Sequence, residues 1–265
     1  MSEVLLHVLI PTYNCGAFIG QAIDSVLREN IQGIKITVID NASTDNTSEV
    51  VGRYASAGVE YRVNRENVGG IENHNKCLDA ARGKYVKLMS ADDVLLPGIL
   101  QLQINALHEN PSVGVVSCNC IVTDERLNPI RKASYLSGWW CGPEVVSKCL
   151  WLVGNIIGGP TNVMMRRSII GSFRWDKRYS WTADLMFFCD LLREADYVGL
   201  EFDGYLYRRH QGTISSTVCP IQVRMKSDAR FIWRFSRLKI EYLRWLYRYA
   251  REYFRSARLA ALPAK

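Results

Sequence analysis

Features that mark several other protein classes are scarce or missing in this 265-residue sequence. Its eight cysteines form no C-x-x-C pair, which argues against a zinc ribbon or a disulfide scaffold and predicts buried thiols in a reducing compartment. The longest uncharged stretch, residues 149–165, is interrupted by three glycines and one proline, so it is a poor candidate for a membrane span. The N-terminus lacks the basic region of a secretory signal, and we therefore expect a cytoplasmic protein.

Positive charge is concentrated at the C-terminal end. The formal net charge is +7, but residues 224–265 hold twelve Lys or Arg against three acids, a net of +9, and the remainder carries −2. Large apolar side chains recur there at intervals of three and four beside a stripe of arginines, which predicts a basic, aromatic-rich amphipathic helix. We favour docking of this tail at an anionic membrane surface or on a partner subunit, a second copy included, over packing on the body alone. No recognition motif supports binding to nucleic acid.

Strand-like and helix-like runs alternate along the first part of the chain. Strands are expected at residues 4–10, 34–40, 59–63 and 85–89, with helices at 17–28, 44–57 and 71–82. This alternation predicts an α/β fold with a mostly parallel central sheet sandwiched by helices. Further on we expect a helix near 97–108, a strand near 113–120, a helix near 183–193 and two short strands within 197–207. We divide the chain into a body, residues 1–217, and a helical tail, residues 218–265.

Carboxylates follow two of the predicted strands. Asp92 and Asp93 come directly after the strand at 85–89, and Asp40 ends the strand at 34–40. Ligands of open α/β sheets bind at these strand ends, where an acid pair can hold a divalent cation and a single acid can accept a base N–H or ribose hydroxyls. The structural alternatives are a cap for a helix starting within 94–97 and, for Asp40, a turn residue. Asp45 is interpreted as a helix cap only.

An ordered set of short motifs resembles a family 2 glycosyltransferase. The resemblance runs from residue 8 to about 98 and continues more weakly to about 216. It rests on Ile10–Asn14, Asp40–Thr47, Asn67–Gly69, Asn75, Ala81–Tyr85 and Ser90–Asp93. The resemblance implies a GT-A fold, a nucleotide diphosphate sugar donor, a divalent metal (Mn²⁺ or Mg²⁺) and inversion at the anomeric carbon. It also divides the body into a nucleotide-sugar-binding half, residues 1–98, and an acceptor-binding half, residues 99–217.

The same resemblance assigns donor-side roles to individual residues. It places the nucleotide at Pro11, Thr12, Tyr13, Asp40, Arg65 and Asp92, the metal at Asp92, Asp93 and His210, and the diphosphate at Arg208 and Arg209. The sequence departs from the family at Ser90, which stands where the first of three acids is usual. We expect this change to weaken metal affinity without abolishing it, because such a metal keeps several waters and needs few protein ligands.

On the acceptor side, the resemblance makes Asp184 the general base that removes the proton of the acceptor hydroxyl. Ala183 replaces the acid that usually precedes it, and the structural alternative is that Asp184 only caps its helix. Trp181, Gly159 and Trp140 lie where the family shapes the acceptor site. An indole face stacks well on a sugar, although the tryptophans could equally be core residues.

These observations predict a metal-dependent inverting glycosyltransferase. The donor would be a nucleotide diphosphate sugar, with UDP favoured, and the acceptor a glycan or a lipid-linked saccharide in cell-surface polysaccharide synthesis, at the inner face of the membrane. One alternative is a polyprenyl-phosphate glycosyltransferase, whose anionic acceptor needs no base. Another is a catalytically silent nucleotide-sugar-binding scaffold. A sugar nucleotidyltransferase fits less well, because no Gly-rich, basic phosphate loop follows the first strand.

Overall fold

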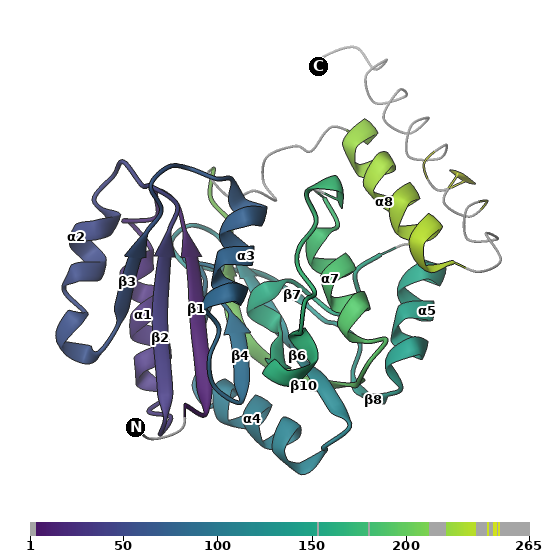
Figure 1. Cartoon of the computed structure of the whole chain (residues 1–265), viewed down its shortest axis with the longest axis horizontal. Helices are drawn as coiled ribbons and strands as arrows, with labels where there is room; N and C mark the ends of the chain where they lie inside the picture. The colour runs from purple at the N-terminus through teal and green to yellow at the C-terminus, as the bar shows by residue number, and fades with distance from the viewer. Residues whose placement is uncertain are drawn as a thin grey trace.

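The computed structural model describes residues 4–152, 154–179, 181–211 and 221–236, together with Leu243, Leu246, Tyr247 and Tyr249. Ten strands form one mixed sheet, in the order β3-β2-β1-β4-β9-β6-β10-β5, with β7 beside β6 and β8 beside β10. Helices cover the sheet on its faces, which gives the layered α/β architecture seen in Figure 1. The predicted fold class is confirmed.

The first half of the sheet is parallel. Its elements are β1 (Leu6–Thr12), α1 (Ile19–Arg28), β2 (Ile34–Asp40), α2 (Thr47–Gly52), β3 (Glu60–Val63), α3 (Gly70–Ala80) and β4 (Tyr85–Leu88). The strands β1, β2 and β4 are mostly apolar and mostly buried because helices pack on both of their faces. Helix α1 buries a stripe that includes Ile19, Ile23 and Val26. Parallel pairing of β3, β2, β1 and β4 brings all four carboxyl ends to one edge of the sheet.

The second half adds antiparallel strands. Its elements are β5 (Val94–Leu95), α4 (Ile99–Glu109), β6 (Val113–Thr123), β7 (Pro129–Ala133), β8 (Gly138–Trp140), α5 (Gly142–Leu152), β9 (Met164–Arg166), α6 (Arg167–Ile170), α7 (Ala183–Leu191), β10 (Asp196–Arg208) and α8 (Ile221–Phe235). The strand β9 runs antiparallel to both β4 and β6, so β6 and its long parallel partner β10 point the same way as β4. The end of β10 therefore reaches the edge at which β1, β2 and β4 end.

Three local predictions are corrected by the structure. Residues 94–95 form the strand β5, paired antiparallel with β10, and the next helix begins only at Ile99. The helix expected over 44–57 is shorter, and a separate 3₁₀ turn, η1, covers Ala55–Ala57. The two short strands expected within 197–207 are one strand, β10, whose pairing with β6 shifts register around Leu200 and Asp203. A bulge keeps a strand continuous where the sequence pattern is broken.

The start of the C-terminal tail packs on the body. Phe231 and Ile232 of α8 are each 1% exposed and belong to the same buried cluster as Phe187 of α7. Their burial supports the packing alternative for this part of the tail, whereas most of residues 237–265 lie outside the described part of the chain. Among the described helices, none is both long enough and apolar enough to cross a bilayer.

Candidate active site

The loops after β1, β2 and β3 are joined by backbone hydrogen bonds at the edge where these strands end. Thr12 and Asp40 are register partners, and the Thr12 carbonyl accepts the N–H of Asn41 at 2.9 Å. The Asp40 carbonyl accepts the N–H of Asn64 at 2.8 Å. Tyr13 follows Thr12 and is 45% exposed, so the rim of this edge offers an aromatic face to a ligand.

Asp40 is buried, at 2% exposure, and both of its carboxylate oxygens have protein partners. The backbone N–H of Ser43 donates to Oδ1 at 3.0 Å, the Ser43 hydroxyl donates to the same oxygen, and the Tyr61 hydroxyl donates to Oδ2. Burial, followed by the hydrogen bond that Tyr61 itself donates to Asp40, raises the pKa of Tyr61 far above its usual range. Asp40 thus serves the turn role that was its structural alternative, and a nucleotide would have to compete with Ser43 or Tyr61 for it.

A ladder of asparagine side chains holds the loop after β3, a feature that the sequence analysis did not assign. Asn41 is the centre: its Oδ1 accepts from Asn64 Nδ2 at 3.0 Å and from the Val68 N–H at 2.9 Å, and its Nδ2 donates to Asn67 Oδ1 at 2.7 Å. A buried amide with all of its partners, such as that of Asn41, rigidifies the loop that it contacts. Arg65 lies within this loop and is exposed, free to face a ligand at the same edge.

Asp45 has the structural role that was predicted for it. Its Oδ1 accepts the N–H of Thr47 at 3.0 Å at the start of α2, and its Oδ2 accepts the N–H of Gly16 at 2.9 Å in the loop after β1. Burial alone would raise the pKa of Asp45, but the hydrogen bonds from Thr47 and Gly16 outweigh burial and lower it. The carboxylate therefore ties two loops of the candidate site together.

The two acids that follow β4 lie in different surroundings. The Asp92 side chain is 15% exposed, and its Oδ2 lies 3.1 Å from Nε2 of His210, which is 13% exposed. Asp93 is buried, at 1% exposure; its Oδ2 accepts the Thr161 hydroxyl at 2.6 Å and its Oδ1 the N–H of Arg208 at 3.3 Å. Burial, reinforced by the charge of Asp92, raises the pKa of Asp93 well above its usual range. Asp92 and His210 form the accessible pair, and Asp93 supports them from behind.

Arg208 is buried behind the acidic motif, which differs from its expected place at a diphosphate. The residue is 2% exposed, and its guanidinium donates to the Asp92 carbonyl at 2.8 Å, to the Glu125 carbonyl and to Gln21 Oε1. It also lies over the ring of Phe18, 4.8 Å from the centroid. Through these hydrogen bonds the buried guanidinium of Arg208 holds Asp92 in place. The neighbouring Arg209 is exposed and can bind an anion.

Replacing Arg208 with lysine should destabilise the fold and weaken the donor site together. Lysine has no planar fork, so it cannot donate to Asp92, Glu125 and Gln21 at once, and buried carbonyls lose partners. We expect a loss of about 3 kcal/mol in the free energy of unfolding, measured by urea denaturation. Arg209→Lys, at an exposed position, is the matched control and should change stability by less than about 0.5 kcal/mol.

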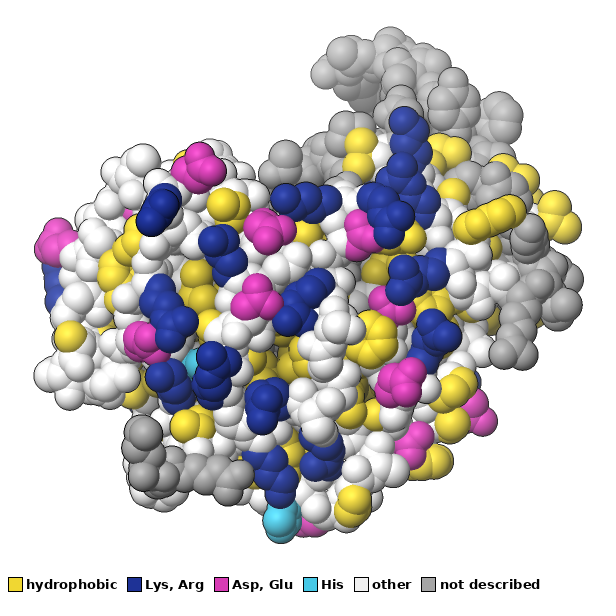
Figure 2. Space-filling view, in the orientation of Figure 1, with side chains coloured by type: hydrophobic (Ala, Val, Ile, Leu, Met, Phe, Trp, Pro, Cys, Tyr) yellow, Lys and Arg dark blue, Asp and Glu magenta, His cyan; other side chains and the backbone are white. Residues whose placement is uncertain are grey.

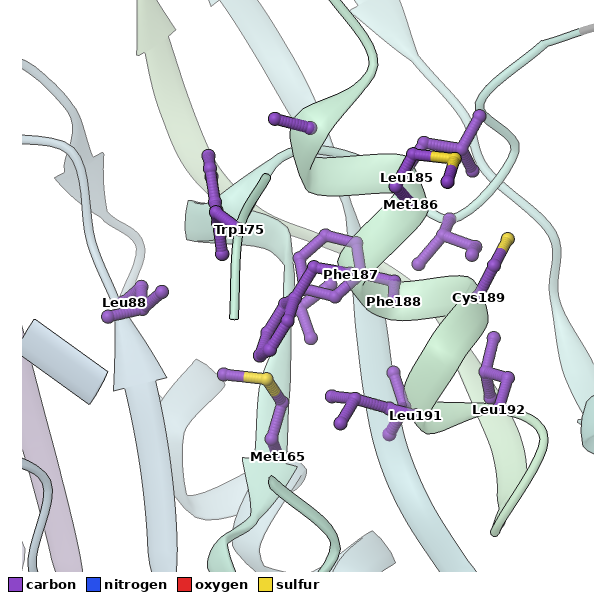
Figure 3. Packing of buried hydrophobic residues seen from close by; sticks show 14 of the residues in the cluster. Leu88, Met165, Trp175, Leu185, Met186, Phe187, Phe188, Cys189, Leu191 and Leu192 are labelled. Carbon is purple, nitrogen blue, oxygen red and sulfur yellow. The ribbon is translucent and has the colours of Figure 1, made fainter. Parts of the chain in front are cut away.

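Asp184 lies in the first turn of α7, a helix anchored by large apolar side chains. Phe187, Phe188 and Leu191 are at most 1% exposed and pack among Trp175, Met165 and neighbouring residues, as Figure 3 shows. This packing fixes the helix, so the position of its first turn is fixed too.

The Asp184 carboxylate itself is only partly accessible. Burial raises its pKa to about 6, although the N–H of Leu185 donates to Oδ1 at 2.7 Å and opposes the rise. Asn155 Nδ2 lies 3.4 Å from its other oxygen, Oδ2. A carboxylate with a pKa near 6 is suited to accept a proton close to neutral pH.

The turn between α5 and β9 connects the two carboxylate centres. It includes Asn155, which contacts Asp184, and Thr161, which donates to Asp93 and accepts the Ser90 N–H at 3.1 Å. Gly159 lies between them, half-buried, with its N–H donated to Asn162 Oδ1 at 2.8 Å. Neither Asn155 nor Thr161 was assigned a role from the sequence. Thr161 belongs to the turn that was expected, with Gly159, at the acceptor side, and Asn155 carried no signal.

The two tryptophans expected at the acceptor side lie in different places. Trp181 is 37% exposed, three residues before Asp184, with the guanidinium of Arg224 5.2 Å from its ring centroid. Trp140 is on β8, paired with Tyr197 at the start of β10, whereas the other end of β10 carries Arg208 beside the acidic motif. Trp140 is half-buried against the core and contacts Lys148, so it is not at the acidic motif.

A metal ion would find a partial site here. The described residues contain no group of three or more His, Cys, Asp or Glu side chains placed to hold one. Asp92 and His210 nevertheless bring a carboxylate oxygen and an imidazole nitrogen together at the accessible edge. Mg²⁺ and similar hard cations are often held by one or two carboxylates with waters and substrate phosphates, so the pair fits that incomplete kind of site.

Comparison with known proteins agrees with this geometry. Residues 7–173 match the family model described as Glycosyl transferase family 2. The chain belongs to that family. It is 34% identical over 188 residues to the uncharacterized protein MT1568 of Mycobacterium tuberculosis, covering 66% of this chain and 58% of that protein. It is 29% identical over 224 residues to the uncharacterized glycosyltransferase EpsJ of Bacillus subtilis, covering 80% and 63%. The chain therefore spans less than two thirds of the length of these relatives.

Solved structures share the fold of this family 2 chain. The Staphylococcus aureus protein TarS (residues 1–349), in complex with UDP-GlcNAc, superposes with a TM-score of 0.68 at 17% identity, over 86% of this chain and 66% of that one. The mannosyltransferase PcManGT from Pyrobaculum calidifontis, in complex with GDP-Man and Mn²⁺, gives a TM-score of 0.62 at 16% identity, over 88% and 65%. At these identities the likeness establishes the architecture alone.

Proposed function

We propose that this family 2 chain is a metal-dependent, inverting glycosyltransferase, which moves a sugar from a nucleotide diphosphate sugar to a hydroxyl of a glycan or lipid-linked saccharide. The observation that carries the proposal is the convergence of the accessible Asp92–His210 pair with the ends of β1 and β2 at one edge of the sheet. Asp184 adds a carboxylate whose pKa is raised to about 6, joined to that edge through the turn at 155–162. A transferase needs a general base of this kind, whereas binding a nucleotide sugar alone does not.

The donor nucleotide would lie across the ends of β1, β2 and β3. Pro11, Thr12 and Tyr13 would pack around the base, with Arg65 and Asp40 near its polar edge, and Asp92 would reach the ribose. UDP is favoured, because a TarS structure with a related fold holds UDP-GlcNAc. A GDP-sugar is the competing choice, because the PcManGT structure holds GDP-Man.

The transfer would be a single displacement. The acceptor hydroxyl oxygen forms a bond to the anomeric carbon while the bond from that carbon to the diphosphate oxygen breaks and its electron pair leaves with the diphosphate. The proton of the hydroxyl passes to the Asp184 carboxylate. Arg209, exposed beside His210, would meet the negative charge of the departing diphosphate.

Asp92 and His210 would hold Mn²⁺ or Mg²⁺, with Asp93 as an inner support. Such an ion, when bound, lowers the cost of bringing the diphosphate close to Asp92 and stabilises it as a leaving group. Arg208 fixes the Asp92 backbone, so the carboxylate keeps one orientation toward the donor.

The exposed face of α8 would dock the protein on a membrane or on a second copy of the chain. Trp233 is 70% exposed, and basic side chains lie beside hydrophobic ones on this helix in Figure 2. Arg234 pairs with Asp190 at 2.7 Å, so part of the positive charge holds α8 to the body, while Lys226 is exposed and available to lipid phosphates. This placement suits an acceptor on a lipid carrier in cell-surface polysaccharide synthesis.

The proposal is tested by thermal stabilisation with UDP, GDP, dTDP and CDP, each with and without Mn²⁺. We expect one nucleotide to raise the melting temperature by several degrees only when Mn²⁺ is present, because a ligand that binds only the folded state stabilises it by an amount that grows with the logarithm of its concentration relative to its Kd. The matching nucleotide sugars should then be consumed. A flat response to all four nucleotides would contradict the donor site and favour the scaffold alternative.

A further inference from the structure

A hollow of about 660 Å³ lies next to the proposed catalytic carboxylate, outside the donor side of the site. Its walls come from residues 134–136 after β7, from the second half of α5 and from residues 155–156 of the turn that follows. The volume falls within the range of about 300–1,000 Å³ that is usual for small-molecule sites. None of these residues was expected to take part in binding.

Asn155 connects this hollow to Asp184. The side chain lines the hollow, and its Nδ2 lies 3.4 Å from Oδ2 of Asp184. Its own Oδ1 accepts the N–H groups of Ile157 and Gly158 at 3.0 and 2.9 Å, so the amide is held in one orientation. The side chain of Asn155 therefore lies between the hollow and the carboxylate that is proposed to remove a proton.

The wall formed by α5 presents aromatic and aliphatic surface. Trp151 and Leu152 are each 55% exposed, although the opposite face of the same helix buries Val145 and Cys149 completely. A flat indole packs against the C–H face of a sugar ring, and the Ser147 hydroxyl oxygen, whose proton is donated to the Pro143 carbonyl at 2.9 Å, can accept from a sugar hydroxyl. An aromatic wall with a few polar groups is the usual make-up of a site for a small polar ligand.

One positive charge lies in the wall, and no acid accompanies it among the lining residues. The ammonium of Lys148 lies 4.2 Å from the ring centroid of Trp140, a cation–π contact that positions it. Trp140 therefore affects the hollow through Lys148 and not by lining it. The unbalanced charge favours a ligand that carries a negative group.

We propose that this hollow is the acceptor site and that it takes a saccharide bearing a negative group, either a carboxylate or a phosphate. The sugar ring stacks on Trp151, the negative group meets Lys148, and the reacting hydroxyl points past Asn155 toward Asp184. The inference rests on the proposed function, because only a sugar transfer gives Asp184 a hydroxyl to deprotonate.

Saturation-transfer NMR on the full chain tests it with three probes: methyl β-D-glucuronide, N-acetylglucosamine 1-phosphate and neutral methyl β-D-glucoside. We expect an anionic probe to bind wild type best, Trp151→Ala to weaken all probes by about tenfold, and Lys148→Met to weaken only the anionic ones. The better anionic probe shows whether the group is a carboxylate or a phosphate. Trp139→Ala is the matched control, because Trp139 is 56% exposed but does not line the hollow.

The inference is overturned if no probe binds wild type, or if Trp151→Ala and Trp139→Ala bind alike. Melting curves with nucleotide and Mn²⁺ separate this failure from that of the proposed function. If nucleotides stabilise the protein but no probe binds, the proposed acceptor site is wrong and the proposed donor site stands. If probes bind in a way that depends on Trp151 but no nucleotide stabilises the protein, the hollow is a saccharide site and the proposed transferase function is wrong.

Discussion

Asp184→Asn should reduce sugar transfer by about a hundredfold to ten-thousandfold, the usual contribution of a general base. The reason is that the amide cannot accept the proton of the acceptor hydroxyl. Nucleotide binding should be unchanged, because Asp184 is proposed to act on the acceptor and contacts Asn155, away from the donor residues. Transfer is measured as release of the nucleotide diphosphate in the presence of acceptor, and binding by thermal stabilisation.

The pH dependence gives this prediction a second readout. With a pKa raised to about 6 by burial, Asp184 is a carboxylate above pH 6 and a carboxylic acid below it. We expect the wild-type kcat/KM to fall about tenfold per pH unit below 6 and to be level above it, while Asp184→Asn is insensitive over that range. A profile that falls in both proteins would assign the titration to another group.

Stability separates the base from a mere helix cap. The folded-state pKa of Asp184, about 6, lies above the unfolded value near 3.9, so the folded state binds more protons between these values. Stability from this group is complete below about pH 4 and is lost as pH rises through 6. Asp184→Asn should therefore melt higher than wild type at pH 8. A lower melting temperature with full transfer would support the cap, or an anionic polyprenyl-phosphate acceptor that needs no base.

Asp92→Ala should abolish nucleotide stabilisation that depends on Mn²⁺, lowering affinity by about a hundredfold or more. Asp92 supplies the carboxylate of the accessible pair, and loss of a metal ligand costs more than the roughly 10–100-fold seen for residues that only orient ligands. His210→Gln should lose about tenfold, since waters and diphosphate still complete the site. Isothermal titration with Mn²⁺ and the nucleotide identified by the melting screen measures both.

Asp79→Ala is the matched control for these variants. Asp79 is an exposed carboxylate on α3, paired with Arg174 at 2.7 Å, and surface pairs of this kind contribute about 1 kcal/mol or less. Its removal should leave nucleotide affinity and its Mn²⁺ requirement unaltered. Equal nucleotide affinity in Asp92→Ala and Asp79→Ala would show that the acidic motif does not bind the metal.

The alternating strands and helices of the first half were predictable from sequence. The strands β1, β2 and β4 are mostly apolar, interrupted by single residues such as His7, Lys35 and Lys87, and each ends within two residues of its predicted boundary. Parallel strands gather their carboxyl ends at one edge, so the proximity of Thr12 and Asp40 followed from local pattern alone. The second half was less predictable, since short antiparallel strands such as β5 and β9 carry too little pattern to be distinguished from loops or helices.

The sequence by itself determined the family, the α/β fold and the strand ends at which a donor site would form, because these depend on local periodicity and short motifs. The family resemblance placed Asp92 and His210 at one metal, but only the tertiary structure showed that they contact each other directly, at 3.1 Å. The tertiary structure also decided that Arg208 is buried as a support and that a hollow opens beside Asn155. Each of these depends on contacts between residues far apart in the chain: Asp92 and His210 are separated by 118 positions. Such contacts depend on how helices and strands pack against each other. The burial of a side chain, and the neighbours that shift its charge state, are set only once that packing has formed.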